Sequence, residues 1–324
     1  GDVIFVHQLI DFDVLPMVLR KDLFPLERRQ SGSLVNSHDI YASGLLLKDT
    51  PGSVNNATIS YTLCEKTYWG GLMNMKRKLF LPKLNDKNVE IETTQSFILI
   101  GANGSGKTRL GAWIEISSPQ KELVHRIPAQ RELSMPDSTK PESIDIAEKD
   151  LLFGNRDWSY QHKHLKWHKK PATQMLSDYD KLLVFLFSNE IEENAKYKNL
   201  CRNSAIKIDP PLTKFDNIKE IWEKILPHRE LVIGGLRIQT RIRGYESEIY
   251  NSSEMSDGER DIFYLIGQCL AAPKDGIIVV DEPELHLHKS VQIELWSEIE
   301  RLRSDCLFVY ITHDIEFAAA YKSA

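Results

Sequence analysis

The chain has 324 residues, of which 42% are hydrophobic and 27% are charged. These fractions are typical of a globular protein with a substantial core, and they exclude a disordered or collagen-like chain. Lys and Arg number 41 and Asp and Glu number 46, so the formal charge is −5 and nucleic-acid binding would require a local basic patch. The clearest apolar run of the second half, residues 182–187, is too short to cross a membrane. The length predicts one large domain or two modest ones.

The four cysteines are scattered along the chain at Cys64, Cys201, Cys269 and Cys306. They form no C-x-x-C pair, which argues against a disulfide framework or a cysteine zinc site and fits a reducing compartment. No basic segment followed by an apolar one opens the chain, so we expect a cytoplasmic protein without a secretion signal. The first residue is Gly1 rather than Met, and little sequence follows the last predicted strand, so we allow for a trimmed start and a C-terminal continuation.

Residues 1–74 are predicted to form a separate N-terminal region whose role the sequence does not define. Short strands are indicated at residues 3–6 and by the alternation of apolar side chains over 59–63. Asp11 and Asp13 form a D-x-D pair of the kind that binds metal. This pattern is common by chance, and a turn is the favoured interpretation.

From residue 75 to residue 324 the pattern predicts one α/β domain. Strands are indicated at 76–81, 89–92 and 96–100, and a helix at 107–116 follows a glycine-rich turn. Residues from about 131 to 211 begin with several prolines and are interpreted as a helical insertion that contains a buried helix around 182–187.

The second half of this domain is easier to interpret. Residues 216–226 predict an amphipathic helix with Asp216 as its N-cap. Residues 230–241 and 246–250 are interpreted as the two strands of a hairpin around Gly244. Helices and strands then alternate at 257–272, 276–280, 289–303 and 306–311, which predicts a largely parallel sheet flanked by helices. Trp222 and Trp296 lie on helical stripes and are expected in the core.

The first chemical motif is a phosphate loop. The segment Gly101-Ala102-Asn103-Gly104-Ser105-Gly106-Lys107-Thr108 matches G-x-x-x-x-G-K-[ST] at every fixed position. Glycines allow successive N–H groups to turn toward phosphate oxygens, and the helix that begins there adds its positive end. Lys107 is the candidate contact for the β- and γ-phosphates, and the Thr108 hydroxyl is a candidate Mg²⁺ ligand. We therefore predict that Gly101, Asn103, Gly104, Ser105, Gly106, Lys107 and Thr108 bind a nucleotide.

The second motif is the pair Asp281 and Glu282, which ends the apolar run 277–280. In α/β sheets the carboxyl ends of the strands face the ligand. Asp281 is the candidate Mg²⁺ ligand because that cation prefers oxygen donors. Glu282 is the candidate general base or water-positioning residue for attack on the γ-phosphate.

Two further motifs follow the same logic. Ser256 and Glu259 have the S-x-x-E spacing of a capping box, which predicts a well-capped core helix. The N-terminus of that helix is also a candidate anion site, with Ser256, Gly258 and Glu259 as nucleotide-binding residues. His313 comes directly after the strand predicted at 306–311, where it can reach the γ-phosphate, and it is a candidate catalytic residue.

Taken in order, these four motifs resemble the ATPase heads of the ABC type. The segment Glu282-Pro283-Glu284-Leu285-His286-Leu287-His288 is similar to the D-E-P-E-x-x-L-H segment of one branch, which contains structural-maintenance-of-chromosomes (SMC), RecF-like and overcoming-lysogenization-defect (OLD) ATPases. The resemblance covers residues 75–324 and implies a P-loop NTPase fold with a mixed sheet flanked by helices and a helical insertion. Stand-alone prokaryotic proteins of this kind are often ATPase components of anti-phage systems such as Septu or PARIS.

The resemblance also implies cofactors and partners. In these families two heads sandwich two ATP molecules, and each site takes its signature serine from the other subunit. We therefore expect ATP and Mg²⁺ as cofactors, ATP hydrolysis, a head-to-tail dimer or higher homo-oligomer, and an effector protein that the ATPase switches in anti-phage defence. Two alternatives stay open. One is the ATPase part of an OLD-like nuclease or of a DNA repair or maintenance system, and the other is an ATP-bound scaffold that holds a toxic effector with little turnover.

The sequence departs from the family pattern in a few places. Asp257 stands where transporters commonly have Gly, and Lys289 stands where this branch often has Pro, but neither change removes a catalytic group. Gln130 is our choice for the glutamine of the family's Q-loop, since Gln120 lies too close to the first helix. No long heptad run lies between the phosphate loop and the S-D-G-E segment, so a long coiled-coil arm is not expected.

Two weaker signals remain. Residues 161–170 combine four Lys, three His and Trp167. A solvated surface segment is the favoured interpretation, but binding of nucleic-acid phosphate with a stacked aromatic, or of a metal, stays open. His286 and His288 resemble a metal pair, and the family context favours a structural or interfacial role.

Overall fold

The computed structural model describes residues 5–6, 76–84, 87–168, 170–204, 206–245 and 248–323. The D-x-D pair of Asp11 and Asp13 and the strand expected over 59–63 lie outside these residues. Of the strand expected at 3–6, the structure describes β1 (Phe5–Val6).

The centre of the fold is a five-stranded sheet in the order β1-β4-β10-β9-β5, and every pair of neighbouring strands is parallel. Besides β1 it contains β4 (Phe97–Gly101), β5 (Val124–Ile127), β9 (Ile277–Asp281) and β10 (Leu307–Thr312). The strands predicted at 96–100, 276–280 and 306–311 are confirmed to within one residue at each end. β5 was not predicted, because a four-residue strand that contains His125 and Arg126 gives no apolar pattern.

One face of this sheet is covered by α1 (Lys107–Ile116) and by a hairpin of β2 (Arg77–Leu84) and β3 (Lys87–Thr93). Leu110 and Ile114 of α1 pack with Leu79 of β2 against Val279 and Val309 of the sheet. The expected mixed sheet is therefore wrong in one respect. Among the described strands the central sheet is parallel throughout, and the antiparallel pairs form separate small sheets.

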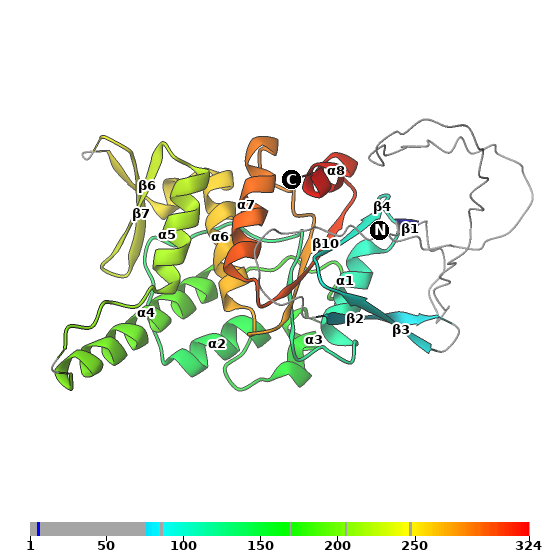
Figure 1. Cartoon of the computed structure of the whole chain (residues 1–324), viewed down its shortest axis with the longest axis horizontal. Coiled ribbons are helices and arrows are strands. Elements are labelled where there is room, and N and C mark those ends of the chain that lie inside the picture. Colours follow the sequence, from blue (N-terminus) through cyan, green and yellow to red (C-terminus); the bar gives the residue numbers. More distant parts are fainter. Residues whose placement is uncertain are drawn as a thin grey trace, which may run out of the picture.

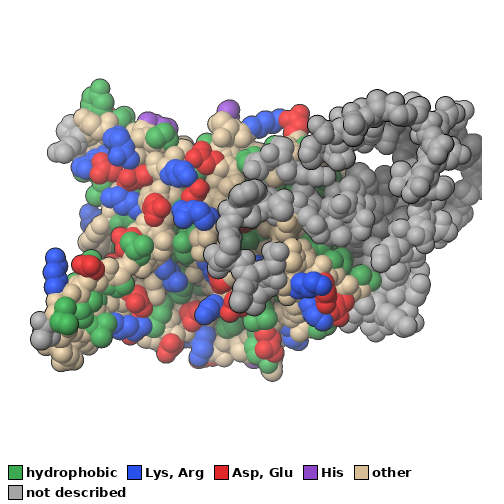
Figure 2. All heavy atoms as spheres, viewed as in Figure 1, with side chains coloured by type: hydrophobic (Ala, Val, Ile, Leu, Met, Phe, Trp, Pro, Cys, Tyr) green, Lys and Arg blue, Asp and Glu red, His purple; other side chains and the backbone are tan. Residues whose placement is uncertain are grey.

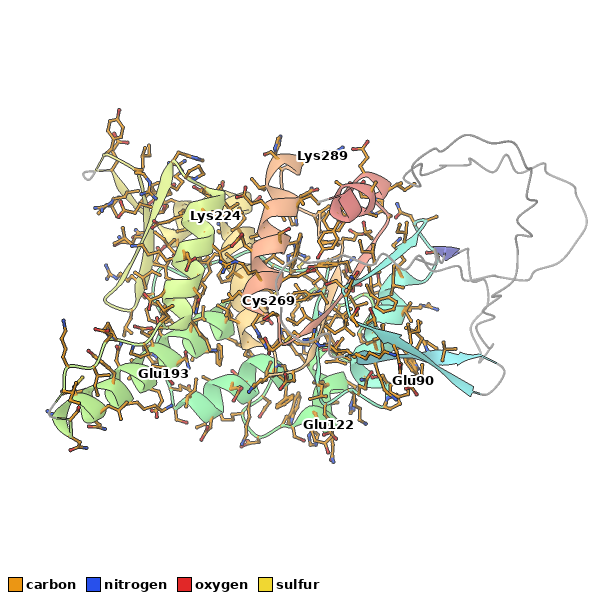
Figure 3. The ribbon with its side chains drawn as sticks, in the orientation of Figure 1. Glu90, Glu122, Glu193, Lys224, Cys269 and Lys289 are labelled. Atoms are coloured by element: carbon orange, nitrogen blue, oxygen red, sulfur yellow. The ribbon has the colours of Figure 1, made fainter. Side chains whose placement is uncertain are left out.

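The other face carries the larger core, and Figure 1 shows its helices stacked beside the sheet. The main ones are α6 (Asp257–Ala271) and α7 (Lys289–Leu302), and α8 (Ile315–Ser323) follows β10. Trp222 and Trp296 are fully buried here, as predicted, and each indole N–H donates to a backbone carbonyl. In Figure 3 the labelled Cys269 of α6 lies within this core, whereas Glu193 of α4 (Tyr179–Arg202) and Glu90 of β3 lie at the periphery.

The region predicted as an insertion at about 131–211 is helical in its described part. It contains α2 (Ile144–Phe153), the short 3₁₀-helix η1 (Tyr160–His162), α3 (Lys163–Lys166) and α4 (Tyr179–Arg202). The first half of α4 buries Leu182, Leu183 and Leu186, which confirms the predicted buried helix. The second half projects away from the sheet, as Figure 1 shows.

Two local predictions are corrected. The helix α5 (Lys214–Ile225) begins after Thr213, and Asp216 is the third helical residue of a capping box with Thr213 rather than the N-cap.

The single strand expected over 230–241 is wrong, since the chain turns back between β6 (Arg229–Gly234) and β7 (Arg237–Ile242). Gly235 and Leu236 both have positive φ, 58° and 60°, as a two-residue type I′ turn requires. β8 (Ile249–Asn251) and the 3₁₀-helix η2 (Ser252–Glu254) complete a three-stranded meander. No described helix is both long enough and apolar enough to span a membrane.

Candidate nucleotide-binding site

The predicted site residues lie mainly at the carboxyl edge of the central sheet. The phosphate loop follows β4, Asp281 ends β9, and His313 follows β10. These three strands are direct neighbours in the sheet, with β10 in the middle. Because parallel strands end at the same edge, three motifs that are far apart in the sequence meet there.

The phosphate loop has the backbone that the sequence predicts. Gly104 and Gly106 have φ values of 79° and 88°, in the left-handed region that glycine adopts without strain. The Lys107 side chain is buried, and its ammonium donates to the carbonyl oxygens of Gly101 (2.8 Å) and Ala102 (2.9 Å). Burial lowers the pKa of Lys107, and the negative charges of neighbouring acidic groups oppose this shift. The Ser105 hydroxyl is buried and has no hydrogen-bond partner among the described residues, so it is available to a ligand.

Asp281 is the most deeply placed charge of the site. Its Oδ2 accepts a hydrogen bond from Arg126 Nη1 at 2.9 Å, while its Oδ1 is buried without a partner among the described residues. Burial raises the pKa of Asp281 to about 6, and the Arg126 guanidinium acts in the opposite direction. A Cβ atom at Gly111 of α1 would come within 3.0 Å of Oδ1, so the carboxylate packs directly on that helix. Thr108 lies three residues before Gly111 and therefore on the same face of α1.

These residues fit a magnesium ion. A buried carboxylate oxygen without a partner is a suitable ligand for a hard cation, and the Thr108 hydroxyl lies on the helix face that this carboxylate contacts. The described residues contain no group of three or more His, Cys, Asp or Glu side chains that could hold a metal. An ion here would thus depend on Asp281, Thr108, phosphate oxygens and water, which is the usual arrangement for Mg²⁺ at a nucleotide.

Glu282 and His313, which were predicted separately as catalytic residues, lie side by side in the structure. The distance between His313 Nδ1 and Glu282 Oε1 is 3.4 Å. Glu282 has a φ of 51°, which is unusual for a residue with a side chain, and its N–H donates to the Ile311 carbonyl of β10 at 2.7 Å. This bond fastens the end of β9 to the neighbouring strand and places the Glu282 carboxylate beside His313.

Glu284 is a further acidic group of the site to which the sequence analysis assigned no role. Its Oε1 lies 3.6 Å from His313 Nδ1 and accepts a hydrogen bond from the Thr312 hydroxyl at 2.7 Å, and its Oε2 is buried without a partner among the described residues. Burial raises the pKa of Glu284, which the Thr312 hydrogen bond opposes. The sequence signal for this role was the position of Glu284, two residues after Glu282 in the D-E-P-E segment, at the same edge of the sheet.

Ser256 forms the predicted N-cap of α6. Its hydroxyl accepts from the N–H of Glu259 at 3.3 Å, and Glu259 Oε2 accepts from the N–H of Ser256 at 2.8 Å. The other oxygen of Glu259 contacts Tyr250 (3.1 Å) and Arg229 (3.0 Å), so both oxygens of this carboxylate have partners within the protein. Within the described residues the hydrogen bonds and ion pairs of Ser256 and Glu259 do not reach the phosphate loop. Gly258 lies close to the His286 carbonyl, 3.6 Å from where its Cβ would be.

Gln130 lies in the loop after β5, at the same edge of the sheet. Its side chain is exposed, and its carbonyl accepts from the N–H of Leu176 at 3.0 Å. The adjacent Arg131 is buried and forms a bidentate pair with Asp261 of α6, at 2.7 and 3.0 Å. The backbone beside Gln130 is thus fixed, while its side chain is directed to solvent.

The interpretation of residues 161–170 as a solvated surface segment holds for Gln161, His164, His168 and Lys170, which are exposed, but a nucleic-acid contact through a stacked tryptophan is wrong. Trp167, Lys163 and Lys166 are buried, so the tryptophan cannot stack on a base. Both ammonium groups donate to backbone carbonyls, Lys163 to Lys121 at 2.7 Å and Lys166 to Leu151 at 2.8 Å. Over the described part of the face in Figure 2, basic and acidic side chains are interspersed.

The pair His286 and His288 shows no metal site within the described residues. The His288 ring accepts a hydrogen bond from the N–H of Ser290 at 3.3 Å and caps α7. His286 is exposed and has a φ of 63°. His288 therefore has a structural role in this chain.

Comparison with known proteins found one family model and several solved structures. Residues 187–319 match the family model described as "AAA domain, putative AbiEii toxin, Type IV TA system". The matched segment contains α6, Asp281, Glu282 and His313, and it begins after the phosphate loop. No curated protein sequence matches the chain.

Solved structures with a similar fold include an SMC head bound to the C-terminal winged-helix domain of ScpA (20% identity, 32% of this chain and 35% of that chain, TM-score 0.25). An SMC head with coiled coil and joint from Pyrococcus yayanosii matches at 16% identity, over 49% of this chain and 31% of that chain, with a TM-score of 0.27. A nucleotide-free ATP-binding cassette from an ABC transporter matches at 16% identity over 77% of this chain and 85% of that chain, with a TM-score of 0.36. The chain thus spans about a third of the length of these two SMC-head chains. At such identities and TM-scores the similarity does not identify a shared activity.

The chain is an α/β P-loop protein with a parallel sheet flanked by helices, and its residues 187–319 are similar to the AAA-domain family model. The phosphate loop implies that its ligand is a nucleotide.

Proposed function

We propose that this protein is an Mg²⁺-dependent ATPase that dimerises head to tail around ATP and thereby switches an effector protein. The observation that carries the proposal is the meeting of three motifs at one edge of the sheet. The phosphate loop, the buried Asp281 and the pair of Glu282 and His313 lie at the ends of three adjacent strands.

Binding of the triphosphate would rest on α1 and the loop before it. The backbone N–H groups of residues 104–108 and the positive end of α1 attract phosphate oxygens. Lys107 would exchange its two carbonyl acceptors for the β- and γ-phosphates, since its ammonium is a point charge on a long, flexible side chain. Ser105 supplies a buried hydroxyl without a partner within the described chain.

Thr108 and Asp281 would hold the metal, which neutralises phosphate charge and helps to orient the γ-phosphate when bound. Asp281 offers the oxygen that makes no hydrogen bond, and its other oxygen stays with Arg126.

Glu282 would accept a proton from the attacking water, and His313 would donate a hydrogen bond to the γ-phosphate. The 3.4 Å approach between the two side chains keeps both at the reacting end of the nucleotide. Glu284 and Thr312 support His313 from the side of β10.

Dimerisation follows from the position of the α6 N-terminus. Gly258 lies at the start of a well-capped helix, whose positive end favours an anion. The N–H and hydroxyl of Ser256 donate to Glu259 Oε2 and would exchange this acceptor for a phosphate oxygen. Among the described residues Ser256 makes no hydrogen bond to its own phosphate loop, and the anion would be the nucleotide of a second copy. We propose that this paired state acts on an effector in defence against phage, in keeping with the toxin–antitoxin description of the matched family.

A second candidate is an ATP-bound scaffold that holds a toxic effector and turns over little ATP. The same family description favours it, because it names a toxin system rather than a catalytic activity. The two candidates differ in turnover: the switch requires hydrolysis for release, and the scaffold does not.

The test compares the parent protein with Glu282→Gln, which keeps the size of the side chain but removes the base. Loss of a general base lowers kcat by about 100- to 10,000-fold. We expect this loss and the accumulation of a nucleotide-bound dimer, measured by phosphate release and by light scattering after size exclusion. The exposed Glu294→Gln on α7 is the matched control and should behave as the parent. Normal turnover by Glu282→Gln would contradict the assignment, and negligible turnover by the parent would favour the scaffold.

A further inference from the structure

Arg126 of β5 is a buried cation that the sequence analysis did not consider. Its side chain is fully enclosed, and its guanidinium has four partners. Nε donates to Glu115 Oε2 of α1 (2.9 Å), Nη1 to Asp281 Oδ2 (2.9 Å) and Nη2 to the Pro171 carbonyl (2.5 Å). The fourth partner is the Trp167 ring, whose centre lies 4.1 Å from the guanidinium carbon.

In this cluster two carboxylates bond to one guanidinium. Glu115 and Asp281 both pair with Arg126, and the ammonium groups of Lys163 and Lys107 act on Glu115 and Asp281 respectively through their charge. Buried charges are generally paired or bind metal ions. The oxygen left for a further cation is Asp281 Oδ1, which has no hydrogen-bond partner among the described residues.

Arg126 also determines which way the Asp281 carboxylate points. A guanidinium bonded to Oδ2 on one side, and a helix face at Gly111 that passes within van der Waals reach of Oδ1 on the other, leave the carboxylate little freedom to rotate. The free oxygen is therefore held on the side of α1, where Thr108 also lies. Lysine could not replace this arrangement, because a single ammonium lacks the planar set of donors that contacts Glu115, Asp281 and Pro171 together.

Arg126 is in turn held by two residues that follow α3. Trp167 stacks on the guanidinium, and the Pro171 carbonyl accepts a hydrogen bond from it. Lys163 ties the same segment to the start of β5 through the carbonyls of Lys121 and Val124.

We propose that Arg126 is a positioning residue for the metal: it orients Asp281 so that one oxygen faces the cation, and Trp167 keeps Arg126 in place. This inference rests on the proposed Mg²⁺–ATP site and adds to it Trp167 and Pro171, which follow α3. Neither Arg126 nor Trp167 touches the nucleotide, so both act through Asp281.

The experiment measures binding of a fluorescent ATP analogue and ATP turnover over a range of Mg²⁺ concentrations, for the parent and for Arg126→Lys. Loss of a side chain that orients a metal ligand raises the metal requirement by about tenfold or more. We expect the half-saturating Mg²⁺ concentration of Arg126→Lys to rise by at least about tenfold, while its affinity for the analogue in EDTA stays within about twofold of the parent, since the phosphate-loop contacts are intact.

The matched control is Arg303→Lys. Arg303 is also buried and bonded to a carboxylate, Asp305, and to backbone carbonyls that include that of Cys269, labelled in Figure 3. It lies before β10, at the opposite edge of the sheet, so its loss should lower stability without a change in the Mg²⁺ requirement.

A parental Mg²⁺ requirement in folded Arg126→Lys would overturn the inference and leave Arg126 as a purely structural group. Should Arg126→Lys fail to fold, Trp167→Leu decides: it keeps the charge cluster but removes the stacked ring, and we expect a smaller rise in the same direction. An unchanged requirement there would overturn the inference. A parent protein that binds no nucleotide would instead refute the proposed function on which the inference rests.

Discussion

The buried histidine of β5 predicts a specific pH dependence of stability. His125 lies within the core beside α6, and its Nε2 is 2.9 Å from Gln268 Oε1. The amide nitrogen of Gln268 donates to Asp178 Oδ2 at 3.3 Å, so its oxygen faces His125, whose ring must carry the proton on Nε2. Tyr264 donates to the other oxygen of Asp178 at 2.8 Å. The neutral form of His125 thus satisfies this network.

Burial lowers the pKa of His125 from 6.5 to about 3, and the positive charge of Lys166 acts in the same direction. Between these two pH values the unfolded chain binds a proton that the folded chain does not bind. The contribution of neutral His125 is therefore complete above pH 6.5 and is lost as the pH falls toward 3. The slope is about 1.4 kcal/mol per pH unit, so the free energy of unfolding should fall by about 2 kcal/mol between pH 7.5 and pH 5.0 through this group alone.

The assay is urea unfolding of the parent and of His125→Gln at pH 7.5 and pH 5.0. Glutamine retains a donor toward Gln268 and does not titrate, and carboxylates contribute equally in both proteins. We expect the loss of stability on acidification to be smaller in His125→Gln by about 2 kcal/mol. The exposed His164→Gln should keep the parental pH dependence. Equal pH dependence in the parent and His125→Gln would refute the reasoning.

Two further predictions concern the site. Gly111→Ala places a Cβ within 3.0 Å of Asp281 Oδ1, so ATP turnover should fall by about tenfold or more although alanine favours the helix. Gly267→Ala in α6, whose Cβ would approach a leucine side chain as closely, is the control, and a loss of turnover no greater than in that control would contradict the prediction. Ser256→Ala removes the N-cap hydroxyl and should lower the free energy of unfolding by about 1 kcal/mol, as measured by urea unfolding. The same change should also weaken ATP-dependent dimerisation, while Glu259 still accepts from the Ser256 backbone; a dimer of parental stability would count against the paired site.

Much of the nucleotide-binding edge could be predicted because its signals are local. A phosphate loop is a contiguous run of residues with steric requirements, and the apolar runs that end at Asp281 and before His313 identify buried parallel strands whose ends must meet. In the structure β4, β10 and β9 are neighbours, and Glu282 contacts His313 at the ends of two of these strands.

The features that were missed depend on tertiary packing. β5 is a strand because its neighbours bury it, although two of its four side chains, His125 and Arg126, are ionisable. Residues 161–170 are mostly hydrophilic in sequence. Trp167 and Lys163 are nevertheless buried, because Trp167 packs on the Arg126 guanidinium and the Lys163 ammonium donates to a backbone carbonyl. Such compensations join residues that are far apart in the sequence, so no local pattern reports them.

The turn at Gly235 was missed for a different reason. Apolar residues lie on both sides of the turn, at 231–233 and at 236 and 238, and the pair Gly234-Gly235 was a local sign of the reversal.

The most direct test of the account is the affinity of the purified protein for a fluorescent ATP analogue with Mg²⁺, compared between the parent and Lys107→Ala. The Lys107 ammonium is the charged donor of the phosphate loop, and a charged hydrogen bond contributes about 1.5–3 kcal/mol, so the affinity should fall by about tenfold to 100-fold. Saturable binding by the parent with this loss in Lys107→Ala is the predicted result. Absence of binding by the parent, or equal affinity in the two proteins, would contradict it.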